Sequence, residues 1–186
     1  MRRILINQMK SIIKHKSFNK ISKGRLRVLA YVLSLIMAFL IQTSVIPLIP
    51  FLSASPNLLL ILTFSIGFIH GNLPGMLYGL GAGLLLDMFY SGPFGFYSLI
   101  FVIIGYFNGF FCNVYYEEYI TLPMIMCVVN EFIYHAYIYI FRFLIRGKYD
   151  VPYYLVHVVL PAVVFSLLAT LVLYRFVFTA TEKIDR

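Results

Sequence analysis

The chain has little charge and almost no cysteine. Only 12% of its 186 residues are charged, and two are cysteines. Cys112 and Cys127 stand fifteen residues apart, a pattern typical of neither a disulfide framework nor a zinc site. We therefore expect both thiols to pack as small apolar side chains, and we expect no metal, no cofactor and no nucleic-acid partner.

Apolar residues take the place of the missing charges. The chain is 61% hydrophobic with a mean hydropathy of +0.89, whereas an ordinary soluble domain is roughly 45–50% apolar and about 25% charged. A compact soluble fold of this length cannot bury such an excess. The apolar runs are long and continuous, which favours helices over the alternating strands of a barrel. The sequence therefore predicts an all-α polytopic membrane protein.

Prolines divide the apolar sequence into about six predicted spans. Proline suits the first turn of a helix, where its missing N–H has no partner to lose. Fresh apolar runs begin at or near Pro56, Pro74, Pro93, Pro123 and Pro152. The predicted spans are 28–51, 56–70, 74–90, 93–111, 119–145 and 152–178. The second and third are short for a bilayer core of roughly 30 Å, so they either lie buried in the bundle or form one re-entrant hairpin across 56–90.

Basic residues predict the topology and the domain organisation. Nine of the fifteen Lys and Arg lie in residues 1–27, and no acidic residue precedes Asp87. The positive-inside rule places this end in the cytoplasm, and six spans return the C-terminus to the same side. We expect a retained basic arm over 1–27, not a cleaved signal peptide. After this arm we expect a single membrane domain over 28–178 and a short cytoplasmic tail over 179–186.

The basic arm has two interpretations. Apolar residues at 5, 9, 12 and 13 share one helical face, and the basic side chains cluster on another, as in an interfacial amphipathic helix. Its lipid-facing basic residues would be Arg2, Arg3, Lys10, Lys14 and Lys16. The alternative, which we favour, is a segment that sets topology and has no partner.

A glycine stripe is the densest signal in the chain. Small residues recur at every fourth position and are followed by an acid: Gly75, Gly79, Gly83 and Asp87. This spacing lets another helix approach closely, and Gly105 and Gly109 would form the complementary surface. Asp87 either accepts hydrogen bonds from the start of the next helix, which we favour, or binds a cation, a substrate or a partner.

The predicted fifth span contains a polar cluster. Its members are Asn130, Glu131, His135 and Arg142. Glu131 and His135 stand at i and i+4, so they share a face, and Arg142 follows Glu131 by about three turns. The cluster could line a cavity or a proton path, but we favour an internally paired structural role. Two ligands are too few for a catalytic metal, which takes about three from the protein.

Catalytic motifs are missing from the sequence. Glu117-Glu118 resembles the double glutamate of intramembrane CAAX-type proteases, but Leu122 stands where that motif has arginine. The companion Phe-xxx-His is absent as well, and no P-loop, HExxH or GxSxG sequence occurs. We therefore expect no catalytic residues and no enzymatic activity.

An ordered set of residues between 40 and 110 resembles the bacterial rod shape-determining MreD family. The set comprises Gln42 in the first span, Pro56-Asn57-Leu58-Leu59-Leu60, the glycine-rich span ending in Asp87, Ser91-Gly92-Pro93-Phe94-Gly95, Gly105-Tyr106 and Gly109. Pro56, Asn57, Gly79, Gly83, Asp87, Gly92 and Gly95 match the family pattern. The resemblance implies that they hold the fold and its partner surface.

The resemblance also implies a function. Proteins of this family are non-enzymatic plasma-membrane components of the machinery that inserts side-wall peptidoglycan in rod-shaped bacteria. They act beside the single-span protein MreC, the actin-like MreB, and the elongation transpeptidase with its glycosyltransferase. Their membrane bundle is similar to the substrate-binding components of ECF vitamin transporters.

Two other functions remain as alternatives. One is an ECF-type vitamin-uptake component, which needs an outward-facing cavity with convergent polar groups. The predicted outer segments 53–55 and 91–93 are short for capping a ligand. The other is a proton- or metal-linked membrane enzyme, which requires Asp87 to converge with Glu131 and His135.

Overall fold

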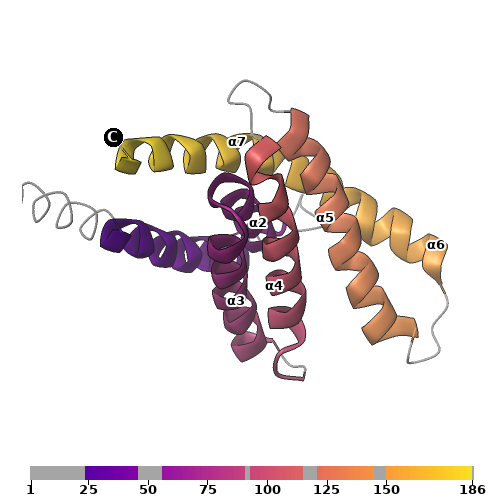
Figure 1. Cartoon of the computed structure of the whole chain (residues 1–186). Coiled ribbons are helices and arrows are strands. Elements are labelled where there is room, and N and C mark those ends of the chain that lie inside the picture. Colours follow the sequence, from indigo (N-terminus) through magenta and orange to yellow (C-terminus); the bar gives the residue numbers. More distant parts are fainter. Residues whose placement is uncertain (1–23, 46–55, 91–92, 115–120, 145–149, 186) are drawn as a thin grey trace, which may run out of the picture.

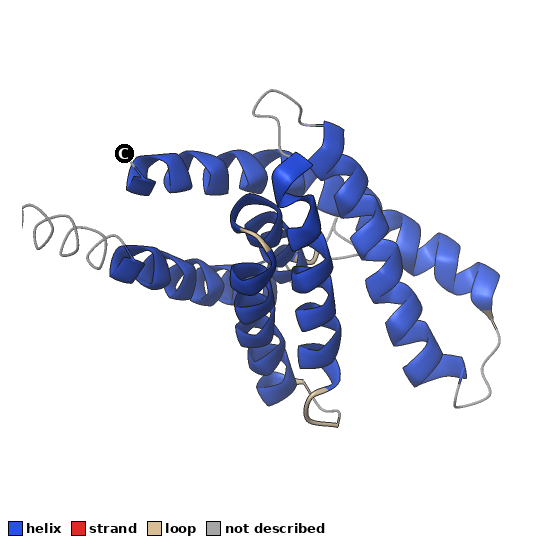
Figure 2. Ribbon diagram, viewed as in Figure 1, coloured by secondary structure: helices blue, strands red, loops and turns tan. Residues whose placement is uncertain are grey.

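The computed structural model describes residues 24–45, 56–90, 93–114, 121–144 and 150–185, and this part is helical without a strand (Figure 2). The helices are a first helix, Gly24–Ser44, followed by α2 (Leu58–His70), α3 (Asn72–Phe89), α4 (Phe96–Gly109), α5 (Thr121–Tyr139), α6 (Val151–Tyr154) and α7 (Leu160–Asp185). A π-helical stretch, Leu155–Val159, joins α6 to α7 in one long helix. The predicted all-α class is confirmed.

Each predicted span coincides with a helix, with shifted ends. Three helices are long and apolar enough to cross a membrane: Gly24–Ser44, Thr121–Phe143 and Val151–Val177. Leu58–His70 and Phe96–Cys112 are shorter apolar helices. The last helix continues past 178 to Asp185, because backbone hydrogen bonding does not stop where the apolar run ends and Ala, Glu and Lys favour a helix.

The short helix α2 lies at the centre of the bundle. Every residue from Leu58 to Phe68 is buried, and α2 contacts α3, α4, α5 and α7. Such all-round burial explains why α2 is apolar on every face. At its end the chain turns at Gly71, whose φ of 95° suits glycine, and continues directly into α3. The interpretation of the second span as a helix buried within the bundle agrees with this position.

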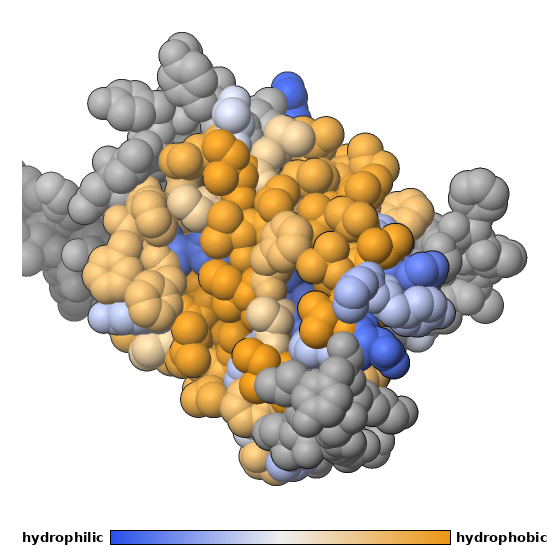
Figure 3. Space-filling model, turned by 90° about the vertical axis from the view of Figure 1, so that its right-hand side faces the viewer, coloured by the Kyte–Doolittle hydropathy of each residue, from blue (hydrophilic) through white to orange (hydrophobic). Residues whose placement is uncertain are grey.

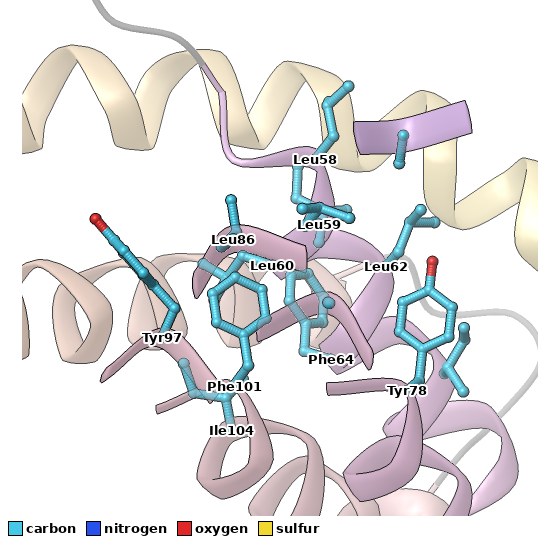
Figure 4. Packing of buried hydrophobic residues seen from close by; sticks show 14 of the residues in the cluster. Leu58, Leu59, Leu60, Leu62, Phe64, Tyr78, Leu86, Tyr97, Phe101 and Ile104 are labelled. Atoms are coloured by element: carbon cyan, nitrogen blue, oxygen red, sulfur yellow. The ribbon is translucent and has the colours of Figure 1, made fainter. Parts of the chain in front are cut away.

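The core gathers around α2. Leu59, Leu60 and Phe64 of α2 are almost completely buried, and Phe101 and Ile104 of α4 belong to the same cluster. Figure 4 shows these side chains together with Tyr78 and Leu86 of α3. Three helices that adjoin in sequence therefore form a packed unit, and Figure 1 shows α3 and α4 side by side along it.

The outer surface is apolar as well. The side that carries α5 and α6 is dominated by hydrophobic side chains (Figure 3). Large apolar residues are exposed on helices throughout the bundle, including Leu33 on the first helix, Phe107 on α4 and Val172 on α7. Water would disfavour such a surface and lipid accepts it. A membrane protein follows from the structure as it does from the composition.

Candidate functional site

The glycine stripe of α3 forms the contact between α3 and its neighbours. A Cβ atom on Gly75 would lie 2.5 Å from the carbonyl oxygen of Gly105. One on Gly79 would collide with the carbonyl of Phe101. One on Gly83 would collide with the backbone of Ser98. Backbone therefore packs on backbone along the length of α3, and the stripe is enclosed inside the bundle.

The opposing glycines of α4 are equally close to their partners. A Cβ on Gly105 would meet the backbone of Gly75, and one on Gly109 would meet that of Asn72. Gly67 on α2 is part of the same contact, since a Cβ there would lie 2.6 Å from the Gly105 oxygen. The helices α2, α3 and α4 thus meet at Gly67, Gly75 and Gly105, where the absence of side chains lets their backbones touch.

Asp87 caps the start of α4. Its Oδ1 accepts a hydrogen bond from the Tyr97 N–H at 2.8 Å. Its Oδ2 accepts from the N–H of Gly95 at 3.1 Å, and from the N–H and hydroxyl of Ser98 at 3.0 and 2.5 Å. The carboxylate thereby satisfies N–H groups that no helical carbonyl can reach, and its charge suits the positive end of the helix dipole.

The backbone before α4 is shaped for this cap. Gly95 immediately precedes α4 with φ 94°, a left-handed conformation that glycine adopts without strain. Its N–H points to the carboxylate of Asp87. Gly92, the other glycine of the predicted motif, lies outside the described residues.

A second cap lies at the start of α2. The side-chain oxygen of Asn57 accepts from the Leu60 N–H at 3.2 Å, the geometry of an N-cap. Gln42, near the end of the first helix, accepts from the Leu59 N–H at 3.1 Å. Pro56 precedes the cap, and its carbonyl accepts from the Leu58 N–H at 3.1 Å. The first helix is thus joined to the central one by polar contacts.

Asn130 faces α4 rather than the other members of its predicted cluster. The amides of Asn108 and Asn130 exchange two hydrogen bonds, of 2.9 and 3.0 Å. Both amides also donate to carbonyls one turn earlier on their own helices. This buried pair connects α4 to α5 with each amide serving as donor and acceptor.

Glu131 and His135 do lie together. Glu131 is completely buried, and its Oε1 accepts from the Ser166 hydroxyl of α7 at 2.5 Å. Its Oε2 has no hydrogen-bond partner among the described residues and lies 3.5 Å from Nε2 of His135. The other ring nitrogen of His135 lies 3.2 Å from the hydroxyl of Tyr154. One oxygen of a buried carboxylate is therefore only weakly compensated, which is costly at membrane depth.

Arg142 is separate from that pair. Its guanidinium lies over the rings of Phe96 and Tyr97, 5.8 and 5.6 Å from their centroids, as in a cation–π contact. The predicted cluster thus divides into three sites: an amide pair, a carboxylate–imidazole pair and a cation above two rings.

Asp87 does not converge with Glu131 and His135, because both of its oxygens are bound at the start of α4. Among the described residues, no group of three or more His, Cys, Asp or Glu could hold a metal ion. The arrangement required by a proton- or metal-linked enzyme is therefore not formed in this part of the chain.

A cavity of about 380 Å³ adjoins the carboxylate–imidazole pair. Its lining combines residues of the first helix, α3, α4, α5, α6 and α7 with Asn57, the N-cap of α2. Its polar residues include Gln42, Asn57, Tyr97, Glu131, His135 and Tyr154. Gln42, Asn57 and Tyr97 lie near helix ends that the chain connects through segments 46–55 and 91–92, so the cavity lies toward that end of the bundle, whereas Glu131 and His135 reach it from within α5.

Several residues in and beside this cavity were not predicted from the sequence. Tyr90, Tyr97, Tyr134 and Tyr154 all line it, but tyrosines near helix ends are also common at membrane interfaces, so their number carried no signal. Ser166, which binds Glu131 beside the cavity, could have been found from the sequence, because a hydroxyl in the apolar run of α7 is expected to have a buried polar partner.

The basic-arm residues Arg2, Arg3, Lys10, Lys14 and Lys16 lie outside the described part of the chain.

Comparison with protein families gives one assignment. The family model of the rod shape-determining protein MreD matches residues 23–184, which is most of the chain. Searches of curated proteins and of solved structures found no match. The matched range includes the capped and glycine-packed helices α2 to α4 and the polar residues of α5. The chain therefore belongs to the MreD family of rod shape-determining membrane proteins.

Proposed function

We propose that this protein is a non-enzymatic component of the cell-elongation machinery that binds an MreC-like bitopic protein and helps control side-wall peptidoglycan synthesis. Membership of the MreD family carries the proposal. The elongation transpeptidase, its glycosyltransferase and MreB-like filaments are further partners, engaged directly or through MreC. Because the described chain is almost entirely helical with an apolar exterior, we expect it to act through helix–helix contacts with other proteins within the membrane.

The first helix is our candidate for the surface that binds MreC. The glycine stripe is occupied by internal packing, so a partner must use an outer face. Of the three long spans, the first helix is the least buried. Leu29, Leu33 and Met37 stand at i, i+4 and i+8 and are all more than half exposed, so they form one apolar stripe. A single transmembrane helix fits such a stripe.

Site-directed photocrosslinking in native membranes tests this surface. A photoreactive phenylalanine analogue at Leu33 should crosslink to MreC. The same analogue at Ile61, which is completely buried in α2, is the matched control and should crosslink to no partner. MreC captured equally from both positions, or from neither, would contradict the proposed surface.

The proposed location is the plasma membrane, with both termini in the cytoplasm. The basic residues of 1–27 support this orientation. The start of the first helix and the end of α7 also project to the same side of the molecule (Figure 1). Single-cysteine variants in a background without Cys112 and Cys127 test it. An impermeant maleimide should label Asp150→Cys in intact cells, and Thr179→Cys only after lysis.

The cavity favours a second candidate, an ECF-type uptake component, because convergent polar groups in a cavity are what such a protein requires. Purification from native membranes in mild detergent separates the two. Recovery of MreC and the elongation synthase supports the first function. Recovery of paired ABC-type ATPases with a transmembrane coupling subunit would replace it with the second.

A further inference from the structure

Glu131 is the most unusual polar group in the bundle. Its side chain is fully buried and lines the 380 Å³ cavity, yet Oε2 makes no hydrogen bond with any described residue. The nearest basic group is Nε2 of His135, at 3.5 Å. A buried carboxylate is expected to have both oxygens compensated, so Oε2 can accept from a donor that none of the described residues supplies.

The rest of the lining suits a positively charged group. Among the described lining residues, Glu131 is the only carboxylate and none is Lys or Arg; His135 and His157 are the basic side chains present. Arg142 is not among them, although its guanidinium lies over the rings of Phe96 and Tyr97, and Tyr97 is part of the wall. Tyrosine rings complete the wall, and the π-faces of such rings attract ammonium groups.

We propose that this cavity binds a compact ligand carrying an ammonium group, which donates to Oε2 of Glu131. The volume falls in the range of small-molecule sites, which span roughly 300–1,000 Å³. Two sources offer the same chemistry: the headgroup of phosphatidylethanolamine, or a free amine from the compartment facing this end of the bundle. The site is independent of the proposed contact with MreC.

The chain itself provides a clean spectroscopic test, because it has no tryptophan. Tyr90 lines the cavity and is partly exposed, so Tyr90→Trp places a single fluorophore at the site. The full-length variant is reconstituted in phosphatidylglycerol vesicles and titrated with ethanolamine. A second preparation includes phosphatidylethanolamine. A saturable emission change with free ethanolamine identifies a soluble amine, and a change only with the lipid identifies the headgroup.

Two further substitutions assign the response to the cavity. Glu131→Gln keeps an oxygen for the Ser166 hydroxyl and removes the charge, and should weaken binding by about ten-fold or more. The matched control is Asp150→Asn, which removes a carboxylate from an exposed position outside the cavity and should leave binding unchanged. Ala162→Leu narrows the cavity without altering charge and should also weaken binding.

Three results would overturn the proposal. They are no response to either amine source, an equal response in Glu131→Gln, and a response to ethyl phosphate in place of ethanolamine. Gel filtration and thermal unfolding of each variant show whether it is folded, and Ala162→Leu gives a second reading if Glu131→Gln is not. If the unsubstituted protein captures MreC but binds no amine, only the proposed amine site is refuted. If it binds an amine but captures no MreC, the proposed function is refuted.

Discussion

Replacing Asp87 with alanine removes four hydrogen bonds at the start of α4, and the alanine side chain offers no acceptor to replace them. The N–H groups of Tyr97 and Ser98 are buried and lose their acceptors, at about 1–3 kcal/mol for each unsatisfied donor. Losing a cap costs typically about 1 kcal/mol by itself. Relief from burying a charge offsets part of this loss. We expect the free energy of unfolding to fall by about 2–4 kcal/mol.

A thiol-reactive dye provides the assay, since Cys127 is completely buried and free. In a Cys112→Ser background, the dye reacts only as the bundle opens around Cys127. For a chain of this size, each kcal/mol corresponds to a shift in Tm of roughly 2–4 °C. Asp87→Ala should therefore lower Tm by roughly 5–15 °C. Asp87→Asn keeps one acceptor oxygen and should lower it by less.

The control is Asp150→Ala. Asp150 precedes α6 in an exposed position and makes no side-chain cap bond, so its Tm should stay unchanged. If Asp87→Ala melted like the parent but no longer captured MreC, the capping argument would be refuted. Asp87 would then act at a partner surface, and the enclosed geometry around it would need another explanation.

Three smaller predictions use the same thermal assay. Gly79→Ala should lower stability by about 1–3 kcal/mol through overpacking against α4, while Gly24→Ala, with open space around it, should not; equal effects would contradict the close contact. Asn108→Ala and Asn130→Ala should be non-additive, with a coupling energy of roughly 0.5–2 kcal/mol, and strict additivity would mean that the amide pair contributes nothing. Asn57→Ala should cost about 1 kcal/mol at the start of α2, and an unchanged Tm would remove its role as a cap.

The family and the fold class were predictable from the sequence because both depend on local patterns. Apolar runs of bilayer length leave helices as the structure, and prolines lie near the start of each helix after the first. The order of Pro56-Asn57, the glycine-rich span and Asp87 was sufficient to suggest the MreD family, which the family match from 23 to 184 confirms. These signals need no knowledge of which helices touch.

The role of each polar group depended on tertiary contacts. Asn130, Glu131 and Arg142 share one stretch of helix, and the sequence joined them in one cluster. The structure directs them to three different neighbours: Asn108 on α4, Ser166 on α7 and the aromatic rings at the start of α4. Helical spacing fixes only the direction in which a side chain leaves its own helix.

The cavity was determined by tertiary structure alone. Its lining combines residues from Gln42 to Ala162, a separation along the chain that no local pattern can relate. The sequence by itself determined that the chain is helical, lies in a membrane and belongs to the MreD family. Only packing decided which backbone atoms each glycine of the stripe meets and that Glu131 keeps one oxygen without a partner among the described residues beside a cavity, because both depend on how the helices are arranged in space.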